Sequence, residues 1–79
     1  MQEDADAQNW LGDRIRQLRE GCGISQEEFA DRCGIHRTHL SKIERGKISP
    51  AVGTLAQIAR TLNIKMSSFF DGWPLDPRK

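Results

Sequence analysis

The sequence predicts a compact all-α domain of five helices. Apolar residues recur at steps of three and four along most of the chain, and nowhere do they alternate with polar residues as in strands. Serine, asparagine and glycine stand where these periodic stretches begin and end, as is typical of helix termini. With 79 residues the chain can form one domain, whose core must use nearly all of its apolar residues.

The first helix is expected to start at Asn9, which can cap it, and to end at Gly21 and Gly23. Residues 1–8 show no apolar periodicity, so we expect a disordered acidic tail there. Trp10 follows the cap and is expected to pack on the core, with a partner surface as the alternative. The other inward residues of this helix lie at steps of four, three and four: Leu11, Ile15, Leu18 and Cys22.

A capping box opens the second helix. The Ser25 hydroxyl can accept from the Glu28 amide, while the Glu28 side chain can reach back to the amide of Ser25. This helix is expected to run to Gly34, and a third helix over residues 37–45 follows, which a glycine ends. Two short helices joined by a glycine turn are the elements of a helix-turn-helix, here about residues 25–45.

The fourth helix is expected to follow Ser49, which can cap it, with Pro50 in the first helical position. Residues 66–70 predict a short fifth helix. The folded domain then covers residues 9–71, and residues 72–79, with two prolines, form a C-terminal tail. Five residues of the fourth helix are expected to face the core: Val52, Leu55, Ile58, Ala59 and Leu62.

The formal net charge is only +1, but the charges are unevenly distributed. Residues 1–8 carry three acidic side chains, whereas residues 37–47 carry four basic side chains against one glutamate. Such a local excess can attract phosphates, because charges are screened over roughly 10 Å at ordinary salt. No stretch could span a membrane, and a signal peptide would begin with basic rather than acidic residues, so we expect a cytoplasmic protein.

The third predicted helix has one apolar side and one basic side. At 100° per residue, Leu40 and Ile43 fall on the apolar side. The polar arc opposite them holds Arg37, Thr38, Ser41, Lys42 and Arg45. A short helix of this kind suits the DNA major groove, where Arg and Lys can bond guanine edges and Thr or Ser can bond bases or phosphates. Amphipathic helices without a ligand share the pattern, so the neighbouring residues must decide.

The side chains that could carry catalysis or bind a metal are scattered. Cys22 and Cys33 lack the CxxC spacing of structural zinc sites, and both are expected to be buried as small hydrophobic residues. A zinc site that adds His36 and His39, which are spaced like zinc-finger histidines, is the alternative. A helical wheel places these groups on different faces, so we expect no enzyme, cofactor, metal or small-molecule ligand.

Several motifs occur in a fixed order between about residues 10 and 70: LGDRIRQLRE, GISQEEFADRCGI, HLSKIERGKISP, TLAQIARTLNI and SSFF. Their order and spacing resemble the Xre family of helix-turn-helix regulators, which includes the phage Cro and repressor proteins. The resemblance implies a Cro/C1 repressor-like fold and a sequence-specific transcriptional regulator that binds double-stranded DNA. The segment HRTHLSKIERG is also similar to controller proteins of restriction-modification systems, which can activate at one site and repress at another.

The resemblance implies roles for individual side chains. Base contacts are implied for the groove-facing residues of the third helix, which are Arg37, Thr38, Ser41 and Lys42. Arg37, the first residue of this helix, is the first choice for a bidentate bond to guanine. Gln26, at the start of the second helix, stands where family members contact a phosphate and brace the base-reading residues. The other phosphate contacts expected are those of Arg14, His36, His39, Arg45, Lys47 and Ser49.

An ion pair is also implied. Members of the family place an arginine late in the first helix against the glutamate of an ERG or ENG motif, and the matching residues are Arg19 and Glu44. A helical wheel puts Glu44 at the edge of the core. We therefore expect a partly buried structural pair, in which the loss of one partner would strand the other charge.

So small a domain contacts too few base pairs to select one genomic site, so we expect a homodimer on a palindromic operator. The expected interface lies in the fifth helix and tail, with the far end of the fourth helix, and uses Met66, Phe70, Trp73 and Leu75. A monomer whose tail folds back is the alternative for the assembly. A DNA-binding antitoxin or protein-interaction module of the same fold is the alternative for the function.

Overall fold

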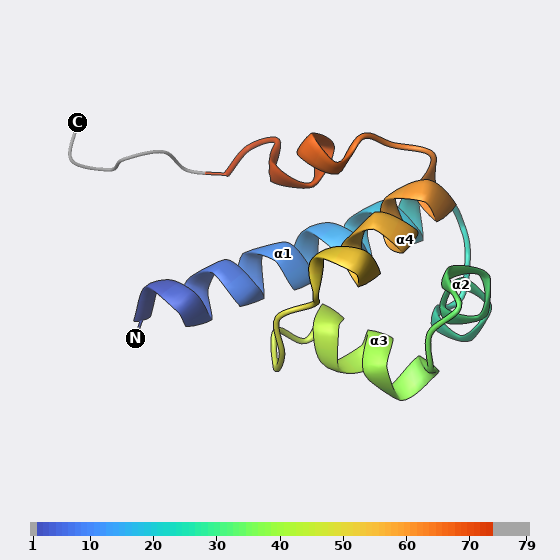
Figure 1. The fold of residues 1–79 in the computed structure, drawn as a ribbon, viewed down its shortest axis with the longest axis horizontal. Coiled ribbons are helices and arrows are strands. Elements are labelled where there is room, and N and C mark those ends of the chain that lie inside the picture. Colours follow the sequence, from blue (N-terminus) through green and yellow to red (C-terminus); the bar gives the residue numbers. More distant parts are fainter. Residues whose placement is uncertain (1, 74–79) are drawn as a thin grey trace.

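In the computed structural model, which describes the backbone of residues 2–73 and the side chains of residues 6–73, four α-helices and one 3-10 helix surround one core (Figure 1). They are α1 (Gln2–Gly21), α2 (Gln26–Cys33), α3 (Arg37–Glu44), α4 (Val52–Leu62) and the 3-10 helix η1 (Met66–Phe70). The prediction of five helices was wrong for the last element, which is 3-10. Its five residues are too few to stabilise an α-helix.

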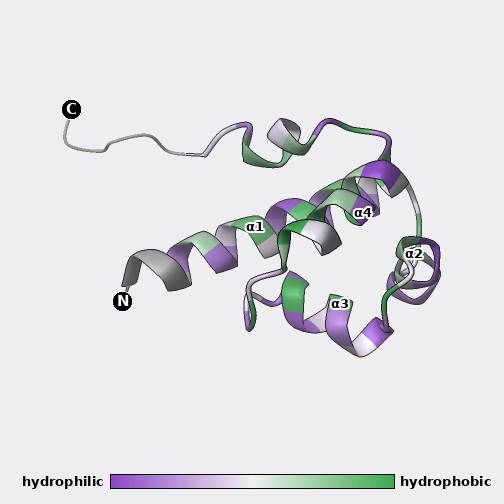
Figure 2. Ribbon diagram, viewed as in Figure 1, coloured by the Kyte–Doolittle hydropathy of each residue, from purple (hydrophilic) through white to green (hydrophobic). Residues whose placement is uncertain are grey.

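Each helix packs one of its sides into the core. α1 packs against α3 and η1, α2 packs against α3 and α4, and α4 packs against η1. In Figure 2 the outer side of α2 and the lower side of α3 are mostly hydrophilic, which fits this arrangement. The buried apolar residues are Leu11, Ile15, Phe29, Ala30, Cys33, Leu40, Ile43, Leu55, Ile58, Ala59 and Phe69.

The first helix begins at Gln2, seven residues before the predicted cap at Asn9. The expectation of a disordered tail over residues 1–8 is therefore wrong for the backbone of residues 2–8. This segment has glutamine, glutamate and alanine, which favour helices, and acidic residues near the positive end of the helix dipole. Apolar periodicity reports which part of a helix packs on a core, and residues 2–8 have none, so it did not predict this part of the helix.

The caps of α2 follow the prediction in part. The Ser25 hydroxyl accepts a 3.1 Å hydrogen bond from the Glu28 amide, which is one half of the capping box. The Glu28 carboxylate instead bonds the side chain of Arg32, one turn further along the helix. Gly34 closes α2 in the left-handed conformation, with φ of 76°, and leads directly into the turn before α3.

The fourth helix starts later than predicted. Its N-cap is Ala51, whose side chain makes no capping bond, so the prediction of a Ser49 cap followed by Pro50 was wrong. Val52, in the first turn, is 73% exposed and does not face the core. Asn63 caps the C-terminus of α4 in the left-handed conformation, with φ of 60°, which asparagine tolerates better than most residues.

A close helix crossing sets the position of α3. A Cβ added to Gly12 of α1 would lie 2.3 Å from the carbonyl oxygen of Ile43 and 2.7 Å from that of Glu44. Only glycine lets the two backbones approach to this distance. Gly12 is thus the contact at which the first helix supports the end of the third.

Two predictions for core residues of α1 were wrong. Cys22 is exposed, because α1 ends at Gly21 and the chain turns away from the core. Trp10 is only half-buried: its ring stacks on Phe70 with centroids 6.2 Å apart and meets the edge of Trp73 at 5.1 Å. These three aromatic side chains, which we call the aromatic cluster, join α1 to the C-terminal segment.

Candidate nucleic-acid interface

The two sides of α3 differ as the sequence predicts. Leu40, Ile43 and Glu44 are buried against the other helices. The opposite side carries the residues predicted to contact bases, of which Arg37, Thr38 and Lys42 are exposed and Ser41 is half-buried. Because the apolar side is held in the core, these polar side chains form an outward row of hydroxyls and cations on α3.

His36 caps α3 through its ring. Its Nδ1 accepts a 3.0 Å hydrogen bond from the Thr38 amide, in place of the hydroxyl of a serine or threonine cap. In the neutral ring Nδ1 then has no hydrogen, so Nε2 carries it and can donate to an external acceptor. The side chain is exposed, and the half-buried His39 lies one turn along the helix.

The segment after α3 adds further polar and basic groups. Arg45, Lys47 and Ser49 are all exposed. Gly46 adopts φ of 73°, and a Cβ there would lie 2.0 Å from Asn9 Oδ1, so the loop passes directly over α1. This contact fixes the loop next to the end of α3.

Arg19 and Glu44 form the ion pair that the sequence implies. Arg19 Nε donates to Glu44 Oε2 at 2.8 Å and Arg19 Nη2 to Oε1 at 3.0 Å, with both residues buried. Arg19 Nη1 also donates to the carbonyl of Ile24 at 2.9 Å, and Gln26 Nε2 donates to Glu44 Oε1 at 3.0 Å. The hydrogen bond to the Glu44 carboxylate raises the pKa of Arg19 above its ordinary value. Together these contacts tie α1, α2 and α3 to one another.

Gln26 therefore has a partner that sequence reasoning missed. The expected role of its side chain was a phosphate contact and support for the base-reading residues, but its amide nitrogen is held by Glu44. An amide nitrogen carries two hydrogens, and this bond uses one. The capping box and the implied Arg19–Glu44 pair were the available signals, since together they place the start of α2 beside the end of α3.

Arg14 has a different place from the one predicted. Its Nη2 donates to the carbonyl of Ser68 at 2.8 Å, and the Asp71 carboxylate lies 4.0 Å away. The guanidinium thus fastens η1 to α1, and the phosphate contact of Arg14 stays a prediction. The signal was not available in the sequence, because it depends on how the C-terminal segment folds back.

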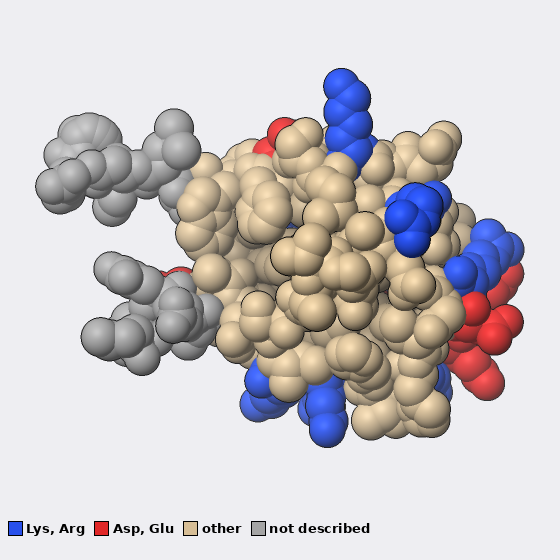
Figure 3. Space-filling model, in the orientation of Figure 1, with Lys and Arg blue, Asp and Glu red and all other residues tan. Residues whose placement is uncertain are grey.

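Charges are separated over the helix-turn-helix. In Figure 3 lysine and arginine side chains project from the lower edge, where α3 and the following segment lie in Figure 1. Acidic side chains gather with basic ones at the edge over α2. The net charge of +1 therefore conceals a cationic edge along α3.

The C-terminal residues predicted as an interface are partly exposed. Met66 is 38% exposed and Phe70 48%, while Trp73 is half-buried against Trp10. Leu75 lies outside the described residues. The aromatic cluster thus buries part of this apolar surface within the chain and leaves the outer side of η1 in solvent.

Neither a cluster of metal-ligating side chains nor a membrane-crossing helix is found in the described residues. Within that part of the chain, no three His, Cys, Asp or Glu side chains gather as they would around a metal ion, and Cys33 is buried while Cys22 is exposed. No helix among the described residues is long and apolar enough to cross a membrane.

The short α2, the tight turn and the outward basic face of α3 define a helix-turn-helix domain of the kind that binds DNA. A family model described as helix-turn-helix, HTH_3, matches residues 15–69. The chain belongs to this family of Xre, or Cro/C1-type, DNA-binding transcriptional regulators, whose members are not enzymes.

Individual relatives support the assignment. The control protein C.BamHI of Bacillus amyloliquefaciens is 33% identical over 62 residues, which cover 77% of this chain and 76% of that protein. The regulator PuuR of Escherichia coli is 34% identical over 59 residues, covering 75% of this chain but only 32% of PuuR. The crystal structure of the restriction-modification controller protein C.AhdI from Aeromonas hydrophila superposes with a TM-score of 0.80 at 29% identity, covering 82% of this chain and 98% of that chain.

The length of these relatives varies. The chain spans 27% of an uncharacterised regulator of Sinorhizobium fredii, y4dL, with which it shares 38% identity over 53 residues. It corresponds to the helix-turn-helix portion of such longer regulators and to most of the length of the small control proteins.

Proposed function

We propose that this protein binds a palindromic operator as a homodimer, with α3 in the major groove. The observation that carries the proposal is the division of α3: its apolar side is buried in the core, while its polar and basic side is presented outward. A helix held this way can read base edges without giving up any core contact.

The base-contacting residues are Arg37, Thr38, Ser41 and Lys42. Arg37 is the first residue of α3 and is exposed, so its guanidinium can reach a guanine and bond O6 and N7 together. Thr38, Ser41 and Lys42 follow on the same side of the helix and complete the reading surface.

Phosphate contacts surround this surface. Arg45, Lys47 and Ser49 are exposed after α3, and the Nε2 of His36 and the half-buried His39 are further donors. Gln26 contributes its remaining amide hydrogen at the start of α2, where Glu44 holds its side chain in place. These contacts should increase the affinity for DNA and make it depend on salt, but they should discriminate little between DNA sequences.

The dimer is proposed to form through η1 and the segment that follows it. The exposed parts of Met66 and Phe70 supply apolar surface, and Trp73 continues it. A two-fold dimer through this face would present two copies of α3 to half-sites about one turn of DNA apart. The similarity to control proteins, of which this chain covers most of the length, favours a small regulator of this kind.

Selection of sites from a random duplex library with the purified protein tests the proposal. We expect an inverted repeat with half-site centres about 10 to 11 base pairs apart, bound in the nanomolar range and much more weakly at higher salt. No enriched motif, with weak and salt-sensitive binding alone, would contradict it and favour a protein-interaction module.

A further inference from the structure

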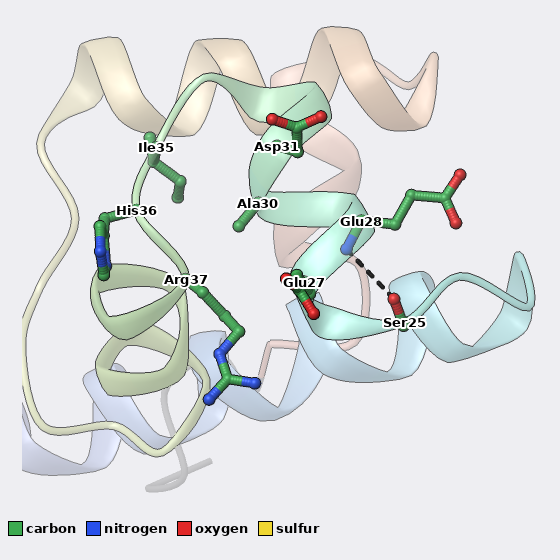
Figure 4. A pocket seen from close by; sticks show the side chains of 8 residues that line it. All are labelled: Ser25, Glu27, Glu28, Ala30, Asp31, Ile35, His36 and Arg37. Atoms are coloured by element: carbon green, nitrogen blue, oxygen red, sulfur yellow. Dashed lines mark hydrogen bonds between the residues drawn. The ribbon is translucent and has the colours of Figure 1, made fainter.

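A pocket between α2 and the start of α3 lies beside the base-contacting end of α3. Arg37 is the only lysine or arginine among the residues that line it, and it shares the pocket with the carboxylates of Glu27, Glu28 and Asp31. Figure 4 shows Arg37 extending from α3 toward the side of the pocket where Glu27 lies. Glu28 points away from Arg37 there, and Asp31 lies at the opposite end.

The three carboxylates differ in their other partners. Glu28 is already paired with Arg32, one turn along α2. Glu27 forms no ion pair with any described residue, and neither does Arg37. Glu27 is thus the carboxylate that remains free on the side of the pocket toward which Arg37 extends.

The backbone at Glu27 is held in place on both sides. Ser25 caps the helix just before it, and the side chain of the adjacent Gln26 is bonded to the buried Glu44. Arg37, in contrast, is an exposed side chain with many rotamers. The backbone that carries Glu27 is therefore held in place on the wall of the pocket that it shares with Arg37, whose guanidinium can move.

We propose that Glu27 is a positioning residue that orients Arg37 for base recognition. A guanidinium presents five donors in one plane, so Glu27 can accept from one edge while the other edge bonds O6 and N7 of guanine. An arginine without such a partner can equally well turn to a phosphate, which is the same for every sequence. The uncompensated carboxylate would also repel phosphates and so weaken binding to non-matching DNA.

This inference rests on the proposed operator binding, and the test uses the duplex selected from the random library by the wild-type chain. The base pair read by Arg37 is identified as the pair at which Arg37→Ala loses its preference. Affinity is then measured for the selected duplex and for a duplex in which that base pair is replaced. The ratio of these two affinities is called the discrimination. We expect Glu27→Gln to lower it about fivefold. Glu28→Gln, which removes the same charge one residue further along, should change it less than about twofold.

A double-mutant cycle shows whether Glu27 acts through Arg37. In the Arg37→Ala background, Glu27→Gln should no longer change the discrimination. In the wild-type background, Glu27→Asp keeps the charge and should retain part of the discrimination that Glu27→Gln loses. Equal effects of Glu27→Gln and Glu28→Gln, or an effect that persists without Arg37, would overturn the role of Glu27 alone. Failure of the wild-type chain to enrich any site would instead overturn the proposed function, and this inference with it.

Discussion

Glu44 is the buried residue on which polar side chains from the first two helices converge. Its carboxylate accepts from Arg19 and from Gln26, and its side chain is only 2% exposed. Arg19 brings the first helix to it and Gln26 brings the second. The end of α3 is thereby fixed by charge-assisted hydrogen bonds as well as by packing.

Arg19→Met, Glu44→Leu and the double variant test this pair. Each single change should lower the free energy of unfolding by about 3 kcal/mol, because it strands a buried charge. The double variant should lose clearly less than the sum, since neither charge then remains. Chemical denaturation of the four proteins measures these differences, and additive losses would contradict a coupled pair.

The two cysteines should differ in reactivity. Cys22 is exposed, whereas Cys33 is buried and the burial raises the pKa of its thiol, so less of the reactive thiolate forms. Brief treatment of the native protein with iodoacetamide should add one carbamidomethyl group, on Cys22, and unfolding should allow the second. Rapid double modification under native conditions would mean that Cys33 is accessible.

At the scale of elements, the packing of α1 against α3 determines where α3 stands. Gly12→Ala would place a methyl group against the backbone of Ile43 and Glu44, so the helices must separate. We expect a loss of about 3 kcal/mol in the free energy of unfolding. Gly53→Ala is the control: it lies in α4 with no atom within 4 Å of the new Cβ, and should stabilise by about 0.5 kcal/mol. Similar stabilities for the two variants, in thermal or urea unfolding, would contradict the close crossing.

Most elements could be predicted from sequence because their signals are local. The capping box set the start of α2, and the spacing of Leu40 and Ile43 showed which side of α3 is buried. Features set by tertiary contacts could not be predicted. The Gly12 crossing and the bond from Arg14 to Ser68 each join segments far apart in the chain, and no local pattern marks them.

For the whole molecule, the proposed dimer predicts a mass of about twice 9.0 kDa in sedimentation at tens of micromolar. Phe70→Glu and Met66→Glu should yield monomers, because each places a charge on the apolar outer side of η1. Val52→Glu, which changes an exposed apolar residue on α4, should remain dimeric. A wild-type monomer would contradict the dimer, and dissociation by Val52→Glu alone would place the interface elsewhere.

The central claim is that α3 reads bases while the segment after it holds the DNA backbone. The most direct test compares Arg37→Ala with Lys47→Ala on the selected operator and on single-base variants of it, at several salt concentrations. Arg37→Ala should cost about 1 to 3 kcal/mol of binding free energy and relax the preference at one base pair. Lys47→Ala should weaken all duplexes equally and reduce the salt slope by about one. If Arg37→Ala weakened every duplex alike and left each base preference intact, α3 would not be the reading element.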